Sequence, residues 1–172
     1  MQGRIGIILA VFVAVLSIAS IASATTVTCP SSETITIGSL VLGSYSDLCV
    51  IDGSKEVLKE GLGGGVSKLQ VQWSFPSVPA GNQVLHYWGT RPTNAEGDNY
   101  QFYVTDRGTP FGILIFGAII NHPFAPNDGI RIPLWNTTTT KNFTVFLADT
   151  NENSGTILDS VTLDCVTIET TP

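Results

Sequence analysis

The sequence contains little of the chemistry that most enzymes use. It has only two histidines, His86 and His122, and no G-x-S-x-G turn accompanies either of them. A nucleophile activated by histidine therefore has no support in the sequence. The glycine run at 61–65 lacks the Lys-Ser/Thr pair of a phosphate-binding loop, so we interpret it as a flexible connection between strands. We expect a protein that is not an enzyme.

Basic residues are also scarce. The chain has 8 Lys and Arg against 14 Asp and Glu, which gives a formal net charge of −6. No stretch gathers the basic residues into a local cluster. Because nucleic acids and anionic lipids attract positive surfaces, this balance excludes nucleic-acid binding.

No stretch after residue 24 repeats its apolar residues with the period of a helix. The N-terminus differs from the rest of the chain, because Arg4 precedes the apolar run Ile5–Ala19 and the small residues Ala22-Ser23-Ala24. This pattern predicts a helical signal peptide at residues 1–24, a single domain at 25–172 and a secreted or cell-surface protein. The alternative is an uncleaved membrane anchor, because about 20 apolar residues span a bilayer.

The three cysteines cannot all pair within one chain. Cys29, Cys49 and Cys165 lie in a chain that we expect to be exported, where thiols are oxidised. First and last strands of a β-sandwich are often neighbours, so we favour a bridge between Cys29 and Cys165. Three reduced thiols are the alternative. No CxxC motif or nearby histidine supports a metal site at these cysteines.

Short runs of β-branched and aromatic residues, separated by turn residues, fill the rest of the chain. Strict alternation is clearest at Leu69–Phe75, where Leu, Val, Trp and Phe alternate with polar residues. This spacing predicts an all-β fold of antiparallel sheets, either a sandwich or a barrel. The run 111–120 is apolar throughout, so it is either a central strand or a surface for a partner.

The stretch Val84–Asp106 is the most strand-like part of the chain. Its runs Val84–Trp88 and Tyr100–Val104 flank a connection rich in Gly, Pro, Asn and Asp. We predict a β-hairpin with a long loop.

Aromatic residues beside Gly- and Pro-rich loops form a candidate binding site. A flat ring in such a position can stack on a sugar, and a nearby acid can accept hydrogen bonds from its hydroxyls. The alternative is that these rings fill the core. The candidate ligand-binding residues are Trp88, Tyr87, Trp135, Tyr45 and Asp98.

Carboxylates crowd the last quarter of the chain, as in the turn Asp149-Thr-Asn-Glu-Asn. Calcium binds through six to eight oxygen ligands, which such loops can supply. The turn lacks the glycine and flanking helices of an EF-hand, so it is either a calcium loop or an ordinary solvated turn. The sequons at Asn136 and Asn142 are further loop features.

Several motifs resemble those of a known group of proteins. They are S-Y-S-D-L-C-V-I-D-G-S at 44–54, W-S-F-P-S-V-P-A-G at 73–81, L-H-Y-W-G-T-R-P at 85–92, D-N-Y-Q-F-Y-V-T-D at 98–106 and D-T-N-E-N-S-G-T-I-L-D-S-V-T-L-D at 149–164. Together they resemble the secreted jelly-roll modules of microbial extracellular enzymes and surface proteins, which are similar to carbohydrate-binding and discoidin-like galactose-binding domains.

The resemblance implies a jelly-roll β-sandwich and a structural calcium ion. In calcium-bearing members an aspartate precedes the last strand, and Asp159 matches that position, with Asp149 or Asp47 as helpers. The paired glutamates usual in the first strand are not found, because Glu33 is single. The expected function is binding of a polysaccharide or another cell-surface component. The alternative is a structural surface or filament subunit that self-associates through strands or apolar faces.

Overall fold

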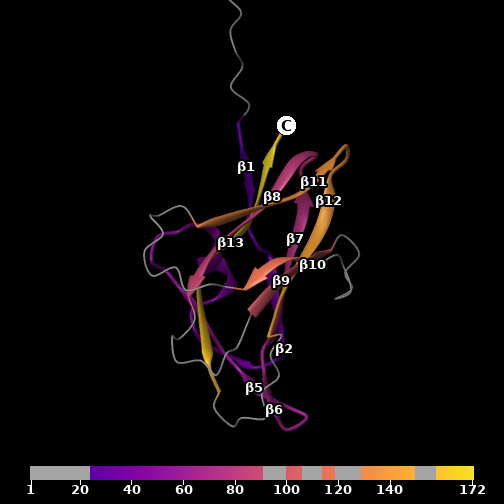
Figure 1. Ribbon diagram of the computed structural model, residues 1–172. Coiled ribbons are helices and arrows are strands. Elements are labelled where there is room, and N and C mark those ends of the chain that lie inside the picture. The colour runs from indigo at the N-terminus through magenta and orange to yellow at the C-terminus, as the bar shows by residue number, and fades with distance from the viewer. Residues whose placement is uncertain (1–23, 91–99, 106–113, 119–128, 150–157) are drawn as a thin grey trace, which may run out of the picture.

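The structure is a computed structural model that describes residues 24–90, 100–105, 114–118, 129–149 and 158–172, with 114–118 described by backbone only. Strands dominate it (Figure 1). They are β1 Thr26–Thr28, β2 Ser32–Ile37, β3 Ser39–Leu42, β4 Glu56–Lys59, β5 Gly61–Gly63, β6 Val66–Lys68, β7 Gln70–Val78, β8 Gly81–Thr90, β9 Tyr100–Thr105, β10 Leu114–Ala118, β11 Ile130–Thr137, β12 Lys141–Asp149 and β13 Ser160–Thr171. A 3-10 helix, η1, spans Tyr45–Cys49.

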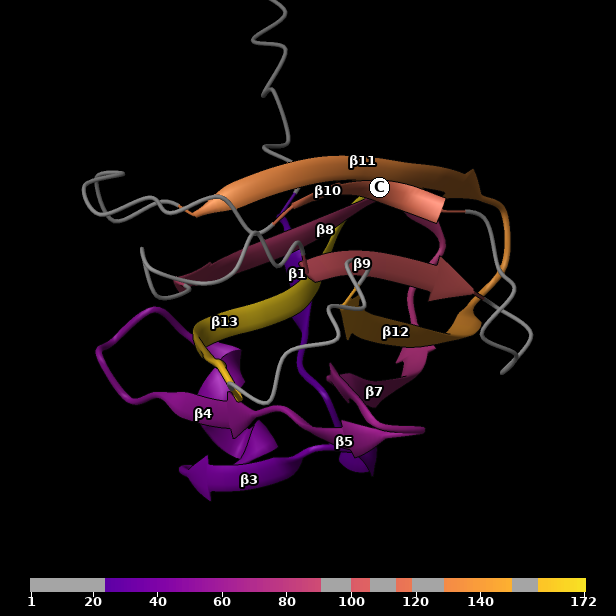
Figure 2. The same cartoon turned by 60° about the horizontal axis from the view of Figure 1, so that its bottom comes forward.

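The strands form two antiparallel sheets that pack face to face. The first, sheet A, has the order β11-β8-β13-β4-β3, and β1 also pairs with β13. The second, sheet B, has the order β10-β9-β12-β7-β2. A separate hairpin pairs β5 with β6. Figure 2 shows β11 at the upper end of the molecule and β3 at the opposite end. This arrangement confirms the predicted all-β fold of antiparallel sheets.

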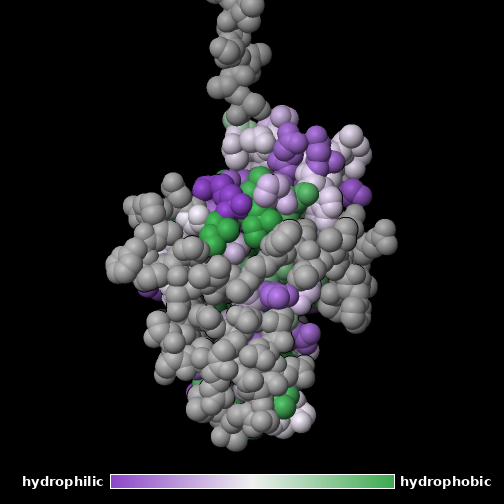
Figure 3. All heavy atoms as spheres, viewed as in Figure 1, coloured by the Kyte–Doolittle hydropathy of each residue, from purple (hydrophilic) through white to green (hydrophobic). Residues whose placement is uncertain are grey.

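Alternating side chains of both sheets build the core. On β7 the buried residues Val71, Trp73 and Phe75 alternate with half-buried polar ones, as the sequence predicts. Tyr87 of β8 meets Phe102 of β9 across the sandwich, with ring centroids 4.5 Å apart. Burying side chains of this size stabilises the fold by about 1.5–3 kcal/mol each. On the face in Figure 3, the described surface carries a small apolar group among polar residues.

The predicted hairpin of Val84–Trp88 and Tyr100–Val104 is wrong. Its first arm lies in β8, which pairs with β11 and β13, and its second lies in β9, which pairs with β10 and β12. The two arms therefore belong to different sheets. They contact each other through core side chains rather than through backbone hydrogen bonds. Local alternation predicts each strand but does not choose its partner.

Two local expectations also need correction. The chain after residue 24 does contain a helical turn, η1, which begins where the Ser44 nitrogen donates to Asp47 Oδ2 at 2.8 Å. A single 3-10 turn is too short to show a helical period. The glycine run 61–65 connects strands only in part, because Gly61–Gly63 forms β5 and only Gly64 and Gly65 make the turn to β6.

The predicted bridge between Cys29 and Cys165 is wrong. Cys29 pairs with Cys49, with their Cα atoms 5.1 Å apart, and Cys165 is a buried free thiol. The expectation that the first and last strands are neighbours was correct, because β1 does pair with β13. However, η1 packs against β13 and brings Cys49 to Cys29.

Some predictions lie outside the described residues. These are the signal segment up to residue 23, Asp98, His122, the turn 150–153 and the run 111–120 except β10. Among the helices of the described residues, none is long and apolar enough to cross a membrane.

Candidate functional site

A shallow hollow of about 350 Å³ lies on the outer face of sheet A. Its lining residues come from β1, the end of η1 with the segment after it, β8 and β13. They are Val27, Cys49, Val50, Ile51, His86, Cys165, Thr167 and Glu169. Val27 and Val50 are half exposed. The hollow therefore combines an apolar rim with polar groups from β8 and β13.

Strand register explains why these polar groups meet. Leu85 and Tyr87 of β8 point into the core, so His86 between them points outward. In the pairing of β11, β8 and β13, Arg131 and Thr167 lie directly opposite His86 on either side. Glu169 lies two residues beyond Thr167 on the same face.

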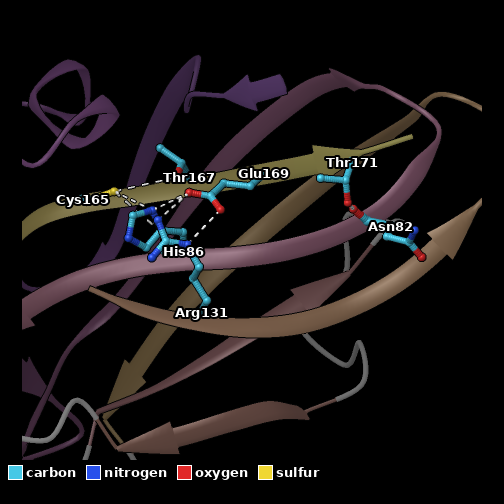
Figure 4. Close-up of polar contacts among 7 residues, drawn as sticks. All are labelled: Asn82, His86, Arg131, Cys165, Thr167, Glu169 and Thr171. Atoms are coloured by element: carbon cyan, nitrogen blue, oxygen red, sulfur yellow. Dashed lines mark hydrogen bonds and ion pairs between the residues drawn. The ribbon is translucent and has the colours of Figure 1, made fainter. Parts of the chain in front are cut away.

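Glu169 joins this row into one network (Figure 4). Its Oε1 lies 2.9 Å from His86 Nδ1, and its two oxygens accept bonds from Arg131 Nε at 3.0 Å and Nη2 at 3.2 Å. The Cys165 sulfur lies 3.9 Å from the same His86 Nδ1 and 3.7 Å from Thr167 Oγ1. Glu169, held by the Arg131 guanidinium and the His86 ring, therefore links β8, β11 and β13 on the outer face of sheet A.

The network does not form a catalytic triad. A histidine base uses one ring nitrogen for the nucleophile and the other for the orienting acid. Here Nδ1 of His86 faces both Cys165 and Glu169, while Nε2 lies against Gly129. Burial raises the pKa of the Cys165 thiol to about 11, so almost no reactive thiolate forms at neutral pH. The arrangement supports structure rather than covalent chemistry.

The predicted aromatic residues do not form one binding platform. Tyr87 is 3% exposed and belongs to the core. Trp135 is half-buried and stacks on Phe143, with ring centroids 5.5 Å apart, and Tyr45 packs against the core from η1. Trp88 lies on the outer face of sheet A, opposite Cys165. Of these four rings, Trp88 alone lies on the face that carries the hollow and is not packed in the core cluster.

The predicted calcium ligands are divided between two places. Asp47 caps η1, whereas Asp159 lies at the start of β13 beside Glu60, which follows β4. Glu60 accepts hydrogen bonds from the Asp159 nitrogen and the Tyr100 hydroxyl, both at 2.9 Å. Burial, with the nearby charges of Asp149 and Asp159, raises the pKa of Glu60. Asp149 and Asp159 thus share one acidic cluster with Glu60, and Asp47 does not belong to it.

A second acidic cluster lies inside the sandwich and was missed from the sequence. Glu56 of β4 is 0% exposed, and burial raises its pKa to about 9, helped by the charge of Glu33 on β2. The signal was the run Glu56-Val-Leu58, because alternation places Glu56 on the same face as the buried Leu58. A glutamate that faces the core is unusual, because burying a charge is costly unless the charge is paired or neutralised.

Within the described ranges, no three His, Cys, Asp or Glu side chains converge in a metal-binding arrangement. Comparison with known proteins identifies no relative: no protein family, no curated protein and no solved structure matches this chain.

Proposed function

We propose that the protein is a secreted structural subunit of a cell-surface assembly, and that it pairs with a second copy of itself through the edge strand β3. The observation that supports this is the exposure of β3. All four residues of the strand are exposed, and Leu40, Val41 and Leu42 expose 43%, 57% and 62% of their surface. Contiguous apolar side chains beside unpaired backbone groups form a template for another strand.

The strands with described side chains at the other ends of the two sheet orders, β11 and β2, carry features that block pairing. β11 contains Pro133, which lacks a backbone N–H, and the charged Arg131. β2 carries Glu33, which faces the core as Trp73 does. β3 has neither proline nor charge. Register shifts occur on all three edges, so they do not distinguish β3.

The partner that fits β3 is a second β3 in antiparallel register. Such a contact is symmetric, because each strand offers the same groups to the other. Two lysines, Lys55 and Lys59, lie in or beside the neighbouring β4, which lowers the negative charge locally in an otherwise acidic chain. Because the strand spans four residues, we expect a weak pair that forms at the high local concentration of a surface array.

The strand order supports a jelly-roll assignment. When β4 and β7–β13 are numbered one to eight along the chain, the sheets read 1-8-3-6 and 2-7-4-5, which is the order of two interlocked Greek keys. The disulfide indicates an oxidising compartment such as the extracellular space. Jelly rolls serve many functions, so the fold alone does not identify one. Glycan binding stays a prediction.

Sedimentation equilibrium of the purified protein, from micromolar to millimolar concentration, tests the proposal. We expect concentration-dependent dimers. Leu42→Lys should weaken association at least tenfold, since losing one buried leucine costs about 1.5–3 kcal/mol and 1.4 kcal/mol is a factor of ten.

Leu62→Lys is the matched control, because Leu62 on β5 is 60% exposed and lies outside β3. It should dimerise like the wild type. A wild type that stays monomeric at every concentration contradicts the proposal, as does equal weakening by the two substitutions.

A further inference from the structure

The interior of the sandwich holds a cluster of buried polar atoms from two glutamates and a tryptophan. Glu56 faces inward from β4 in sheet A, and Glu33 shares the inner face of sheet B with its cross-strand neighbour Trp73. Four buried atoms of these residues have no hydrogen-bond partner of standard geometry among the described residues. They are Glu33 Oε1, Glu56 Oε1, Glu56 Oε2 and Trp73 Nε1.

Two carboxylates cannot both stay ionised at this place. Leaving a buried charge unpaired costs several kcal/mol, and like charges so close together repel. Among the described residues, the charged groups that act on Glu56 are Glu33 from β2 and Asp47 from η1, and both are acidic. Opposite Glu56 on β13 lies Leu163, which is apolar. No counter-charge from these elements neutralises the pair.

We propose that Glu33 and Glu56 bind one shared proton across the two sheets, and that the protein is built to be most stable in an acidic medium. The protonated Glu56 then donates its O–H to Glu33, while the Trp73 indole N–H donates to the remaining oxygen of Glu56. One proton in this way satisfies all the orphaned polar groups of the cluster. This inference is independent of pairing through β3.

The pKa values agree in direction with this geometry. Burial raises the pKa of Glu56 to about 9 and also raises that of Glu33. In the unfolded chain a glutamate titrates near pH 4.5. The folded state therefore keeps a proton that the unfolded state loses. The stabilising effect is complete below about pH 4.5 and is lost as the pH rises toward about 9.

Thermal and denaturant unfolding of the purified protein between pH 3 and pH 9 tests the proposal. We expect the folding equilibrium constant of the wild type to fall up to tenfold for each pH unit between about 5 and 9, because one proton separates the two states. Glu56→Gln should remove the contribution of Glu56 to this slope, since an amide does not titrate, and leave only that of Glu60, whose pKa burial also raises. A wild-type profile that is flat or rises over this range overturns the proposal, as does Glu56→Gln with the full slope.

Two further variants serve as a control and as an alternative to Glu56→Gln. Asp52→Asn removes an exposed acid and should keep the wild-type slope. If Glu56→Gln does not fold, Glu33→Gln gives the answer, because loss of the neighbouring charge should end the descending limb at a lower pH. An unchanged limb in Glu33→Gln counts against a shared proton.

A metal ion is the competing occupant. If calcium or magnesium at pH 8 raises the melting temperature of the wild type but not that of Glu56→Gln, the two carboxylates hold a cation and the proton proposal is overturned. No effect of these ions on that difference supports the proton.

Discussion

Cys165 and Cys49 both line the hollow on sheet A, yet only Cys49 forms a disulfide. Cys165 is buried, and burial raises its thiol pKa to about 11. A protonated, covered thiol neither attacks a disulfide nor reacts readily with external reagents. At the scale of residues, proximity to Cys29 selects Cys49 for the bridge, and burial keeps the remaining thiol of Cys165 protonated and covered.

The first prediction concerns these thiols. Alkylation of the folded protein at pH 7 should label no cysteine, and alkylation after unfolding should label one, Cys165, as measured by intact mass. Cys49→Ser should lower the free energy of unfolding by about 3 kcal/mol, because the bridge closes a loop with a sequence separation of 20. Peptide mapping that finds Cys165 in a disulfide would refute this assignment.

Among the elements, β13 organises sheet A. It spans Ser160–Thr171 and pairs with β1, β4 and β8. Its inner face supplies core residues such as Val166 and Ile168, while its outer face supplies Cys165, Thr167 and Glu169 to the hollow. Its start is fixed by two contacts between Asp159 and Glu60, one from the Glu60 nitrogen to the Asp159 carbonyl and one from the Asp159 nitrogen to Glu60 Oε2, each 2.9 Å long.

The calcium prediction belongs to this junction. Asp159 is 8% exposed, and its Oδ2 has no partner within the described part of the chain. If calcium binds here, saturation at a hundred times the dissociation constant stabilises the folded protein by about 2.7 kcal/mol. The melting temperature at pH 7 should then rise with calcium and fall with chelator, and Asp159→Asn should abolish the difference.

Asp47→Asn is the control, because Asp47 caps η1 instead of joining this cluster. It should lower the melting temperature equally with and without calcium. Identical melting temperatures of the metal-stripped and calcium-loaded wild type would show that calcium does not bind and stabilise the folded protein.

On the scale of the whole molecule, two sheets enclose one core. Glycan binding would therefore have to take place on an outer face of the sandwich. Among the predicted rings, Trp88 is the best placed, on the outer face of sheet A. If that face binds polysaccharide, Trp88→Ala should weaken retention on an insoluble polysaccharide about tenfold, since an aromatic contact contributes about 0.5–1.5 kcal/mol beyond its buried area.

Trp135→Ala separates binding from stability in this assay. Because Trp135 stacks on Phe143, its loss should lower the melting temperature whether or not a glycan binds. A wild type that is not retained, or a Trp88→Ala protein retained equally well, would exclude glycan binding through this face.

The amino-acid sequence by itself determined the fold class and most of the core. Strict alternation at Leu69–Phe75 placed the core-facing residues correctly, because the two-residue period of a strand is a local property of the chain. Composition and turn residues likewise indicated antiparallel sheets. Trp73, one of the alternating apolar residues of that run, is fully buried in the core.

Only the tertiary structure decided which segments meet. Cys49 replaced Cys165 as the partner of Cys29, and β8 and β9 went to different sheets, because pairing depends on contacts between residues far apart in the sequence. The same holds for Glu33 and Glu56, which lie on different sheets and meet only when the sandwich closes. Alternation marked the inward face of Glu56, but it could not show that the residue facing it is another acid.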